Sequence, residues 1–516
     1  MKSFRPGIAG LNRKNQITSH RAKSMSKRLP KSYYNPLSYA GTAIALIALF
    51  MFFFLYVLSS FSSVEQAYVG IVLFLVIPFF IILGLVLIPI GMWRRARWMK
   101  KTGEMPKRDY PVLDLNQPRQ RNATIIFTAG TLVFLFLSAF GSYEAYHFTE
   151  SVEFCGKLCH EIMEPEYTAY HTSPHARVTC AQCHVGEGAS WFVKSKLSGV
   201  AQVWHTLRND YPRPIPTPVE NLRPARETCE TCHWPQKVYG QQQRREIHFL
   251  ADETNTQWEI RLLLHTGTGN PALGQAHGIH WHINQNIRIE YQPANEKRTE
   301  IGKVVLINES TGEETVYNNP NVEENDSPMR VMDCIDCHNR PSHIYRSPST
   351  FIDRAIVAGE IDSTLPYIKM TAVQACVQEY ESDEQAIEGI ASYITEFYAD
   401  MEVSQAKVEK SIQGTIAAFQ RNIFPYMNVT WQAYPNHIDH MTTDGCFRCH
   451  NDLHQSDDGK TISKTCTQCH DITAQGPIDS LEFSQTAASL EFKHPVDIGM
   501  GWQEINCSEC HSVPPY

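Results

Sequence analysis

The sequence lacks the features of several simple protein classes. Only 19% of its 516 residues are charged, 43% are apolar and 28 are glycine, which excludes a disordered chain and a collagen-like one. Cysteine is almost absent outside one recurring pattern, which contains fourteen of the fifteen cysteines. The length suffices for two or three domains.

Acidic residues are nearly missing from the first 122 residues. This part has 18 Lys and Arg residues, but its only acids are Glu65, Glu104, Asp109 and Asp114. Residues 123–516 hold 28 basic and 50 acidic residues, a balance of −22. The two parts of the chain therefore face different surroundings.

Charge is entirely missing from three apolar runs, which begin at Leu37, Ala67 and Ala123. A helix rises about 1.5 Å per residue, so about 20 residues cross the hydrocarbon core of a membrane. We therefore expect three transmembrane helices within residues 37–148. The alternative is that these runs form buried helices of a soluble protein.

Cations are missing from the short connection "SSFSSVEQ", whereas residues 1–36 and 93–122 are strongly basic. Because cytoplasmic loops carry the excess of Lys and Arg, we expect a cytoplasmic basic leader over 1–36 and a periplasmic domain from about residue 149 onward. The leader is too long for the start of a signal peptide, and no cleavage site of small residues follows it, so we expect no processing. The chain is thus expected in the inner membrane.

A cysteine pair followed directly by histidine is present seven times. The copies are CGKLCH (Cys155, Cys159, His160), CAQCH (Cys180, Cys183, His184), CETCH (Cys229, Cys232, His233), CIDCH (Cys334, Cys337, His338), CFRCH (Cys446, Cys449, His450), CTQCH (Cys466, Cys469, His470) and CSECH (Cys507, Cys510, His511). The first copy has three residues between its cysteines, and the other six have two.

Disulfides and zinc ribbons also use paired cysteines. Neither requires a histidine directly after the second cysteine. Attachment of c-type haem does require it, because two thioether bonds hold the porphyrin while the adjacent imidazole reaches the iron. The seven copies therefore predict seven covalently bound haems, and the remaining cysteine, Cys376, is expected to be a buried thiol.

Each haem iron also needs a second axial ligand, for which neutral imidazole is the usual choice. Seven of the 22 histidines lie in the motifs, and fifteen remain. Positions close to motifs favour the candidates His175, His280, His282, His343, His437, His440, His454 and His494. A surface or capping role is the alternative at each position, and the pairing of ligands with particular haems stays open.

The periplasmic part divides into four segments. Residues 149–240 contain the first three motifs, and residues 241–330 alternate between apolar and polar side chains, which predicts a small β-rich insertion. Residues 331–430 hold the fourth motif and a helical stretch, and residues 431–516 hold the last three motifs. The expected fold is a membrane-anchored multihaem cytochrome c, with three N-terminal transmembrane helices and a mainly α, loop-rich haem domain.

The stretch from the third apolar run through "CGKLCHEIMEPEY", "SPHARVTCAQCH" and "LRPARETCETCHWP" resembles the NapC/NirT/NrfH family of membrane-anchored quinol dehydrogenases, over residues 123–240. With seven motifs and three predicted helices, the whole chain resembles the larger inner-membrane cytochromes of metal-reducing bacteria, of the ImcH type. The resemblance implies that the haem nearest the bilayer oxidises menaquinol at the outer face of the inner membrane.

The resemblance also implies roles for residues near the first motif. The family uses a Met shortly after its first haem motif as an axial ligand, which corresponds here to Met163, three residues after His160 rather than two. The acidic position of the family's quinol pocket is Gln202 in this chain, and Lys194 and Lys196 are further pocket residues. Independently of the resemblance, the short distance from the third apolar run to the first motif makes Glu144, His147, Glu153 and Glu164 candidates for taking up the protons that quinol oxidation releases. Ordinary solvation at the interface is the alternative for each of them.

We therefore expect a seven-haem quinol dehydrogenase that passes electrons from menaquinol to periplasmic c-type cytochromes, without any nucleic acid partner. One alternative is a membrane anchor and electron-transfer subunit whose acceptor is a docked periplasmic reductase. A second is a terminal multihaem reductase acting on nitrite or hydroxylamine, which would need an iron with an open position. Oligomeric state and haem potentials cannot be read from the sequence.

Overall fold

The computed structural model describes residues 30–61, 76–103, 114–157, 160–185, 189–218, 224–238, 240–274, 276–323, 325–486 and 488–512. Nearly all of the basic leader and Cys159 lie outside the described residues. The chain divides into two compact units, Met1–Phe140 and Gly141–Tyr516. Each unit is described by itself below.

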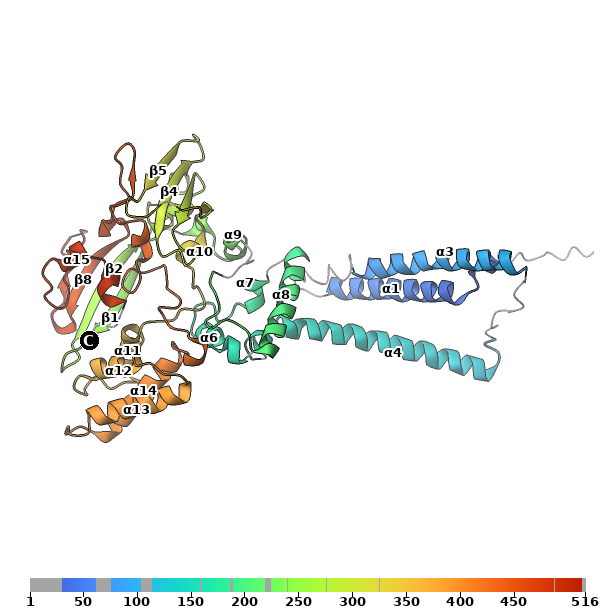
Figure 1. The fold of residues 1–516 in the computed structure, drawn as a ribbon, viewed down its shortest axis with the longest axis horizontal. Helices are drawn as coiled ribbons and strands as arrows, with labels where there is room; N and C mark the ends of the chain where they lie inside the picture. Colours follow the sequence, from blue (N-terminus) through green and yellow to red (C-terminus); the bar gives the residue numbers. More distant parts are fainter. Residues whose placement is uncertain are drawn as a thin grey trace, which may run out of the picture. The chain divides into compact units, whose positions relative to one another are not determined.

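The first unit contains the helices expected from the three apolar runs (Figure 1). They are α1 (Pro36–Phe61), α3 (Ile77–Thr102) and α4 (Pro118–Thr149). The last turns of α4, from Gly141 onward, belong to the second unit. Each is long and apolar enough to cross a membrane. The prediction of three membrane-spanning helices is confirmed by these elements.

Helices α1 and α3 pack closely through small residues. A Cβ atom on Gly84 would collide with the backbone at Gly41, and one on Gly91 would collide with Ser38. The Ser38 hydroxyl donates a hydrogen bond to the Ile88 carbonyl across the interface, at 3.0 Å. Small residues let helix backbones approach and interhelical hydrogen bonds hold them, which is how helices associate in lipid.

The second unit contains short helices around the motifs and longer helices elsewhere. The helices are α5 (Val152–Lys157), α6 (His160–His171), α7 (Cys180–His184), α8 (Ala189–Arg208), α9 (Ala225–Cys229), α10 (Cys334–Cys337), α11 (Pro348–Val357), α12 (Ile368–Cys376), α13 (Asp383–Phe397), α14 (Gln405–Gln420), α15 (Gly501–Glu504) and α16 (Cys507–His511). The strands are β1 (Gln241–Phe249), β2 (Gln257–His265), β3 (Ile287–Pro293), β4 (Ile301–Asn308), β5 (Glu314–Asn318), β6 (Arg330–Val331), β7 (Gln455–Ser456), β8 (His470–Pro477) and β9 (Glu482–Phe483).

The strands form two antiparallel sheets, in the orders β1-β2-β8-β9 and β6-β3-β4-β5-β7. Strands β1 to β6 come from the predicted β-rich insertion, apart from the last residue of β6. Strands β7 to β9 come from the C-terminal three-motif segment, where no strand was expected. Both sheets therefore join the insertion to the C-terminal segment.

Helices α11 to α14 form one group in Figure 1, beside the sheet that contains β1. Their apolar residues make the largest buried cluster of the described chain, which includes Ile352, Ile368, Ile390 and the thiol of Cys376. This helical group corresponds to the helical stretch predicted after the fourth motif. Cys376 is 2% exposed, as expected of a buried thiol, and burial raises its pKa.

Candidate haem-binding sites

Each of the six CxxCH motifs overlaps a short helix or a single helical turn. Three of these turns share one capping pattern. The residue before the first cysteine donates a backbone hydrogen bond to the side chain of the residue before the second cysteine. The backbone N–H of Thr179 donates to Gln182 at 2.8 Å, that of Asp333 to Asp336 at 2.7 Å and that of Asn506 to Glu509 at 3.2 Å. The motif thus caps its own turn.

Each of the six CxxCH histidines faces a second histidine from another part of the chain. The ring centroids are 6.3 Å apart for His184 and His343, 5.9 Å for His233 and His175, 6.3 Å for His338 and His280, 5.8 Å for His450 and His282, 6.3 Å for His470 and His440, and 6.1 Å for His511 and His494. All six partners are among the candidates that the sequence suggested.

This separation suits a metal ion held between two imidazoles. A metal–imidazole bond is about 2.0 Å long, so two rings on opposite sides of one ion have centroids about 6 Å apart. Two protein ligands are what a haem iron requires, because the porphyrin nitrogens occupy its other positions. The six pairs therefore fit c-type haem attached through the cysteines of the same motifs.

Five of the six partner histidines have their other ring nitrogen engaged, whereas Nδ1 of His440 is buried without a hydrogen-bond partner among the described residues. In five of the six, Nδ1 lies within hydrogen-bond distance of a backbone carbonyl: His175 at 3.2 Å from Pro341, His343 at 3.1 Å from Glu166, His280 at 2.7 Å from Thr266, His282 at 2.6 Å from Ile279 and His494 at 2.8 Å from Val496. A proton on Nδ1 leaves the Nε2 lone pair free for a metal, and such bonds orient metal-binding histidines.

Metal binding requires neutral imidazoles, and burial favours the neutral form in seven of the paired histidines. Desolvation lowers the pKa of His184, His282, His338, His440, His470 and His511. It lowers the pKa of His343 to about 4, with a smaller contribution from the neighbouring His184. Neutral nitrogen ligands are therefore available at neutral pH.

The cysteines also support this arrangement. All fourteen described cysteines are free thiols, so no disulfide occurs in the described part of the chain. A hydrogen bond joins the thiols of Cys155 and Cys180, and another joins those of Cys229 and Cys334. Sequence-distant motifs therefore meet in neighbouring pairs, the first with the second and the third with the fourth.

Two predicted ligand candidates have other surroundings. In the described part of the chain, neither His437 nor His454 faces a motif histidine. His454 is fully buried, and both its ring nitrogens are within hydrogen-bond distance of oxygens, Nδ1 of Asn451 at 3.0 Å and Nε2 of Ile301 at 3.1 Å. Both ring nitrogens of His454 are therefore engaged within the protein.

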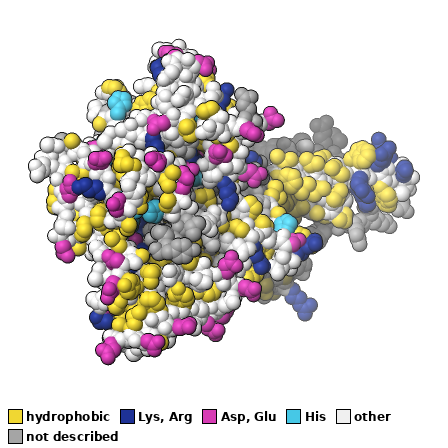
Figure 2. Space-filling view, turned by 60° about the vertical axis from the view of Figure 1, so that its left-hand side comes forward, with side chains coloured by type: hydrophobic (Ala, Val, Ile, Leu, Met, Phe, Trp, Pro, Cys, Tyr) yellow, Lys and Arg dark blue, Asp and Glu magenta, His cyan; other side chains and the backbone are white. Residues whose placement is uncertain are grey.

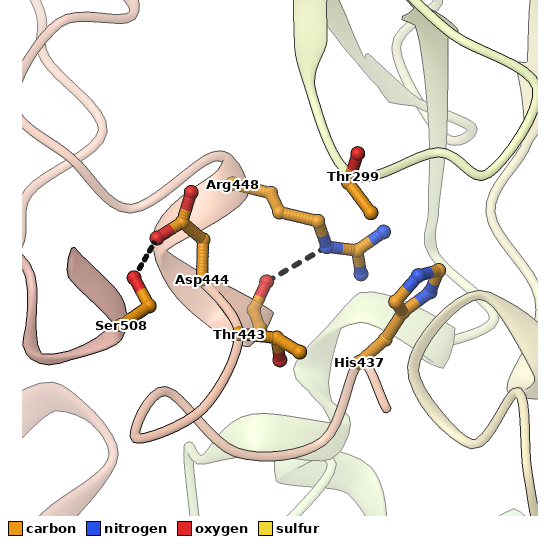
Figure 3. A pocket seen from close by; sticks show the side chains of 7 residues that line it. Thr299, His437, Thr443, Asp444, Arg448 and Ser508 are labelled. Carbon is orange, nitrogen blue, oxygen red and sulfur yellow. Dashed lines mark hydrogen bonds between the residues drawn. The ribbon is translucent and has the colours of Figure 1, made fainter. Parts of the chain in front are cut away.

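His437 lines a cavity of about 210 Å³ together with Thr299 and Arg448 (Figure 3). Its Nδ1 lies 3.3 Å from the Asp336 carbonyl, and its buried Nε2 has no hydrogen-bond partner in the structure. Burial lowers the pKa of His437 to about 3. The Arg448 guanidinium donates to the carbonyls of Arg298 and Asp336, so this residue ties the fifth motif to the fourth.

The first motif is only partly described. Cys155 lies in α5 and His160 begins α6, which also contains Met163. A Cβ atom on Gly156, between the two cysteines, would overlap the Tyr167 ring, so the glycine lets α5 pack directly on α6. The motif therefore sits on a tight pair of helices immediately after α4.

Lys196 is the residue of the predicted quinol pocket that lies beside the first motif. Its Nζ is 3.0 Å from Glu150, the residue that follows α4, and both side chains act electrostatically on the Cys155 thiol. Glu150 was not singled out in the sequence, although its place directly after a membrane helix was a usable signal. Lys194 lies on another side of α8, with Nζ 4.6 Å from the Trp191 ring centroid.

The other predicted residues around the first motif are accessible. Gln202 is exposed and donates a hydrogen bond to the Ser198 hydroxyl at 3.2 Å. Glu144 and His147 are exposed on the last turns of α4, where the His147 ring contacts Tyr143 at 4.4 Å between centroids. Acidic and imidazole side chains are therefore exposed at the start of the second unit, Gly141–Tyr516, which is called the haem-binding unit below.

Comparison with known proteins agrees with this geometry. Residues 117–214 match the model of the NapC/NirT cytochrome c family, N-terminal region. The chain is 42% identical over 490 residues to the cytochrome c-type protein ImcH of Geobacter sulfurreducens, which covers 93% of this chain and 95% of that protein. No solved structure matches the chain significantly.

Proposed function

This chain belongs to the family of the cytochrome c-type protein ImcH, and from this premise we propose that it oxidises menaquinol at the periplasmic face of the inner membrane. The electrons then pass to periplasmic c-type cytochromes in anaerobic or extracellular respiration. Members of the NapC/NirT family are membrane-bound multihaem electron-transfer proteins that in general oxidise quinols. The chain carries c-type haem as a cytochrome c, and we propose that it carries seven.

The six histidine pairs are the observation that carries the electron-transfer part of this proposal. We assign the members of each pair as the two axial ligands of one haem, attached at the motif that supplies the first histidine. When bound, each haem supplies an iron that takes up and releases one electron. An iron with two strong imidazole ligands has no open position for a substrate, which favours electron transfer over reduction of nitrite or hydroxylamine.

The first motif is proposed to be the place where electrons from quinol enter the protein. It follows α4 directly, where a lipid-dissolved quinol can reach it, and Met163 is the proposed axial ligand beside His160. Lys196 is proposed to hold a quinol oxygen, since its ammonium group lies beside Glu150 and close to Cys155. Glu144 and His147 on α4, with Glu153 and Glu164, would accept the released protons.

The excess of acidic side chains on the haem-binding unit favours partners with a cationic surface. Residues 123–516 have a balance of −22, and on the face shown in Figure 2 Asp and Glu side chains are more widespread than Lys and Arg. Opposite charge speeds the encounter of two proteins and orients them before contact. The proposed acceptors are therefore cytochromes with Lys-rich docking patches.

The direct test is to mix the purified full-length protein with a reduced menaquinone analogue and follow the haem absorbance. Rapid reduction of the haems is expected, and a water-soluble donor without a quinol head group should be much slower. The proposal fails if dithionite reduces every haem while the quinol reduces none.

A further inference from the structure

Helix α8 (Ala189–Arg208) has an exposed apolar stripe that nothing in the described part of the chain covers. Leu197 is 68% exposed, Val200 70%, Val203 54%, Trp204 59% and Leu207 78%. Single exposed apolar residues are normal in a folded protein. Five of them on one helix are not, and contiguous patches of this kind mark interaction surfaces.

The spacing places these residues on one side of the helix. Leu197, Val200, Trp204 and Leu207 follow each other at intervals of three or four residues, which is the repeat of one helical face. Ser198, Gln202 and His205 occupy another side, so α8 is amphipathic. Ser195 and Thr206, which are only partly exposed, lie between the two sides. Lys196 lies one turn before Val200, on the side of the stripe, and is partly exposed where it bonds to Glu150.

The charge of α8 is opposite to that of its surroundings. It contains Lys194, Lys196 and Arg208 but no Asp or Glu, within a region whose balance is −22. The Lys194 Nζ lies 4.6 Å from the Trp191 ring centroid, and the Arg208 guanidinium lies 5.8 Å from that of Trp204. Tryptophan beside Lys or Arg is the usual composition of segments that lie at the surface of a lipid bilayer.

The position of α8 in its unit agrees with a lipid partner. Lys196 is bonded to Glu150, one residue beyond the end of the membrane helix α4. The start of α8's apolar stripe is therefore held next to the point where the chain leaves the membrane. A protein partner would have to occupy the same narrow region at the bilayer.

We propose that α8 lies in the headgroup region of the outer leaflet, with Leu197, Val200, Val203, Trp204 and Leu207 in the lipid and the exposed Lys194 and Arg208 at the phosphates. The helix is a second membrane contact, independent of the three transmembrane helices. It fixes how the haem-binding unit stands on the bilayer and goes beyond the proposed function, because it does not require quinol oxidation.

The test uses the full-length protein in vesicles of phosphatidylethanolamine and phosphatidylglycerol, with thiols introduced one at a time. Val200→Cys probes the apolar stripe and Ser198→Cys the polar side of α8. Val357→Cys is the matched control, since Val357 is 54% exposed at the end of α11. The native Cys376 is buried and should stay silent.

A water-soluble maleimide should label the thiol at position 200 at least about tenfold more slowly than those at 198 and 357, because burying a residue of this size in lipid is favourable by about that factor. A photoreactive phosphatidylcholine in the same vesicles should attach to α8 and not to α11. Equal maleimide rates at 200 and 357 would overturn the proposal. Slow labelling at 200 without lipid attachment would also overturn it, because the stripe would then be covered by haem, by a second copy or by another protein.

Discussion

The imidazole rings of His280 and His338 lie 6.3 Å apart between centroids and within 6° of parallel, although the residues come from a loop of the β-rich region and from the fourth motif. The rings of His282 and His450 are 5.8 Å apart but inclined by 82°. His280 and His282 are neighbours in the same short turn, Ile279–Ile283. One turn of chain thus places a histidine opposite each of two motifs. One pair of rings is nearly parallel and the other nearly perpendicular.

The first prediction follows from these angles. Parallel ligand planes split the iron d orbitals that perpendicular planes leave nearly equal in energy, so the two kinds of haem differ in their low-spin EPR signals. The pairs His280–His338 and His440–His470, at 6° and 22°, should give one class, and His282–His450 and His175–His233, at 82° and 77°, another. EPR of the oxidised protein measures this, and a single uniform class would contradict the assignment.

The second prediction separates two histidines that are three residues apart. His440 faces the motif histidine His470, whereas His437 lines a cavity beside Arg448. His440→Ala should convert one haem to a high-spin form, because its iron loses a ligand. His437→Ala should leave every haem low-spin, although it removes a buried ring. The optical and EPR spectra of the two variants decide, and a high-spin haem in His437→Ala would transfer the ligand role to His437.

The third prediction concerns the first motif. If Met163 is an axial ligand, Met163→His supplies a stronger nitrogen donor and lowers the potential of one haem, by on the order of 0.1 V, because thioether ligation raises haem potentials. Met401→His is the control, since Met401 is an exposed residue between α13 and α14, in a helical group that contains no haem motif. A redox titration followed optically gives the result. Unchanged potentials in Met163→His would remove Met163 from the ligand set.

The fourth prediction concerns the sheet that carries the sixth motif. Glu259 in β2 is fully buried, and its carboxylate binds Arg245 at 2.5 Å and Arg261 at 2.6 Å. Glu259→Gln should destabilise the protein by about 2–4 kcal/mol, because two guanidinium groups lose a buried partner. Glu246→Gln removes an ion pair with Arg244 that is more exposed, and should cost less than about 1 kcal/mol. Thermal unfolding of both variants tests the difference.

The same carboxylate makes stability depend on pH. The hydrogen bond from Arg245, with a further contribution from Arg261, holds the pKa of Glu259 below its usual value against the effect of burial. A lowered pKa in the folded state adds stability above the pKa of the unfolded chain, near 4.3, and this stability is lost as pH falls through the folded value. The acid loss of stability should be smaller in Glu259→Gln than in the native protein.

Much of the site could be predicted because covalent haem attachment requires adjacent residues. The cysteines and histidine of each motif stand together in the sequence, and the six facing histidines were all among the candidates. Their pairing was out of reach, because it depends on contacts between distant segments. His343 follows the fourth motif but faces His184 of the second. His175 stands just before the second motif but faces His233 of the third.

The membrane helices were predictable for a similar local reason, since length and lack of charge decide them. Strands β7 to β9 were not, because β7 and β9 have only two residues each and β8 begins inside a motif, at His470. Their formation depends on pairing with β5 and β2. The amphipathic character of α8 was present in its spacing, but the sequence could not show that the apolar side stays uncovered.

The last prediction concerns Lys196, which differs from Lys194 only in its neighbours. Lys196 bonds to Glu150 beside Cys155, whereas Lys194 lies against Trp191. If a quinol oxygen binds at the first motif, Lys196→Ala should raise KM for the quinol about tenfold, the value of one hydrogen bond to a charged group, with little change in kcat. Lys194→Ala should have a smaller effect, and Lys196→Arg should restore part of the affinity because the charge is kept. Haem spectra and potentials should be native in all three, since neither lysine is a ligand. Equal losses for Lys194→Ala and Lys196→Ala would mean that the basic character of α8, rather than the Lys196–Glu150 pair, determines how quinol reaches the first haem.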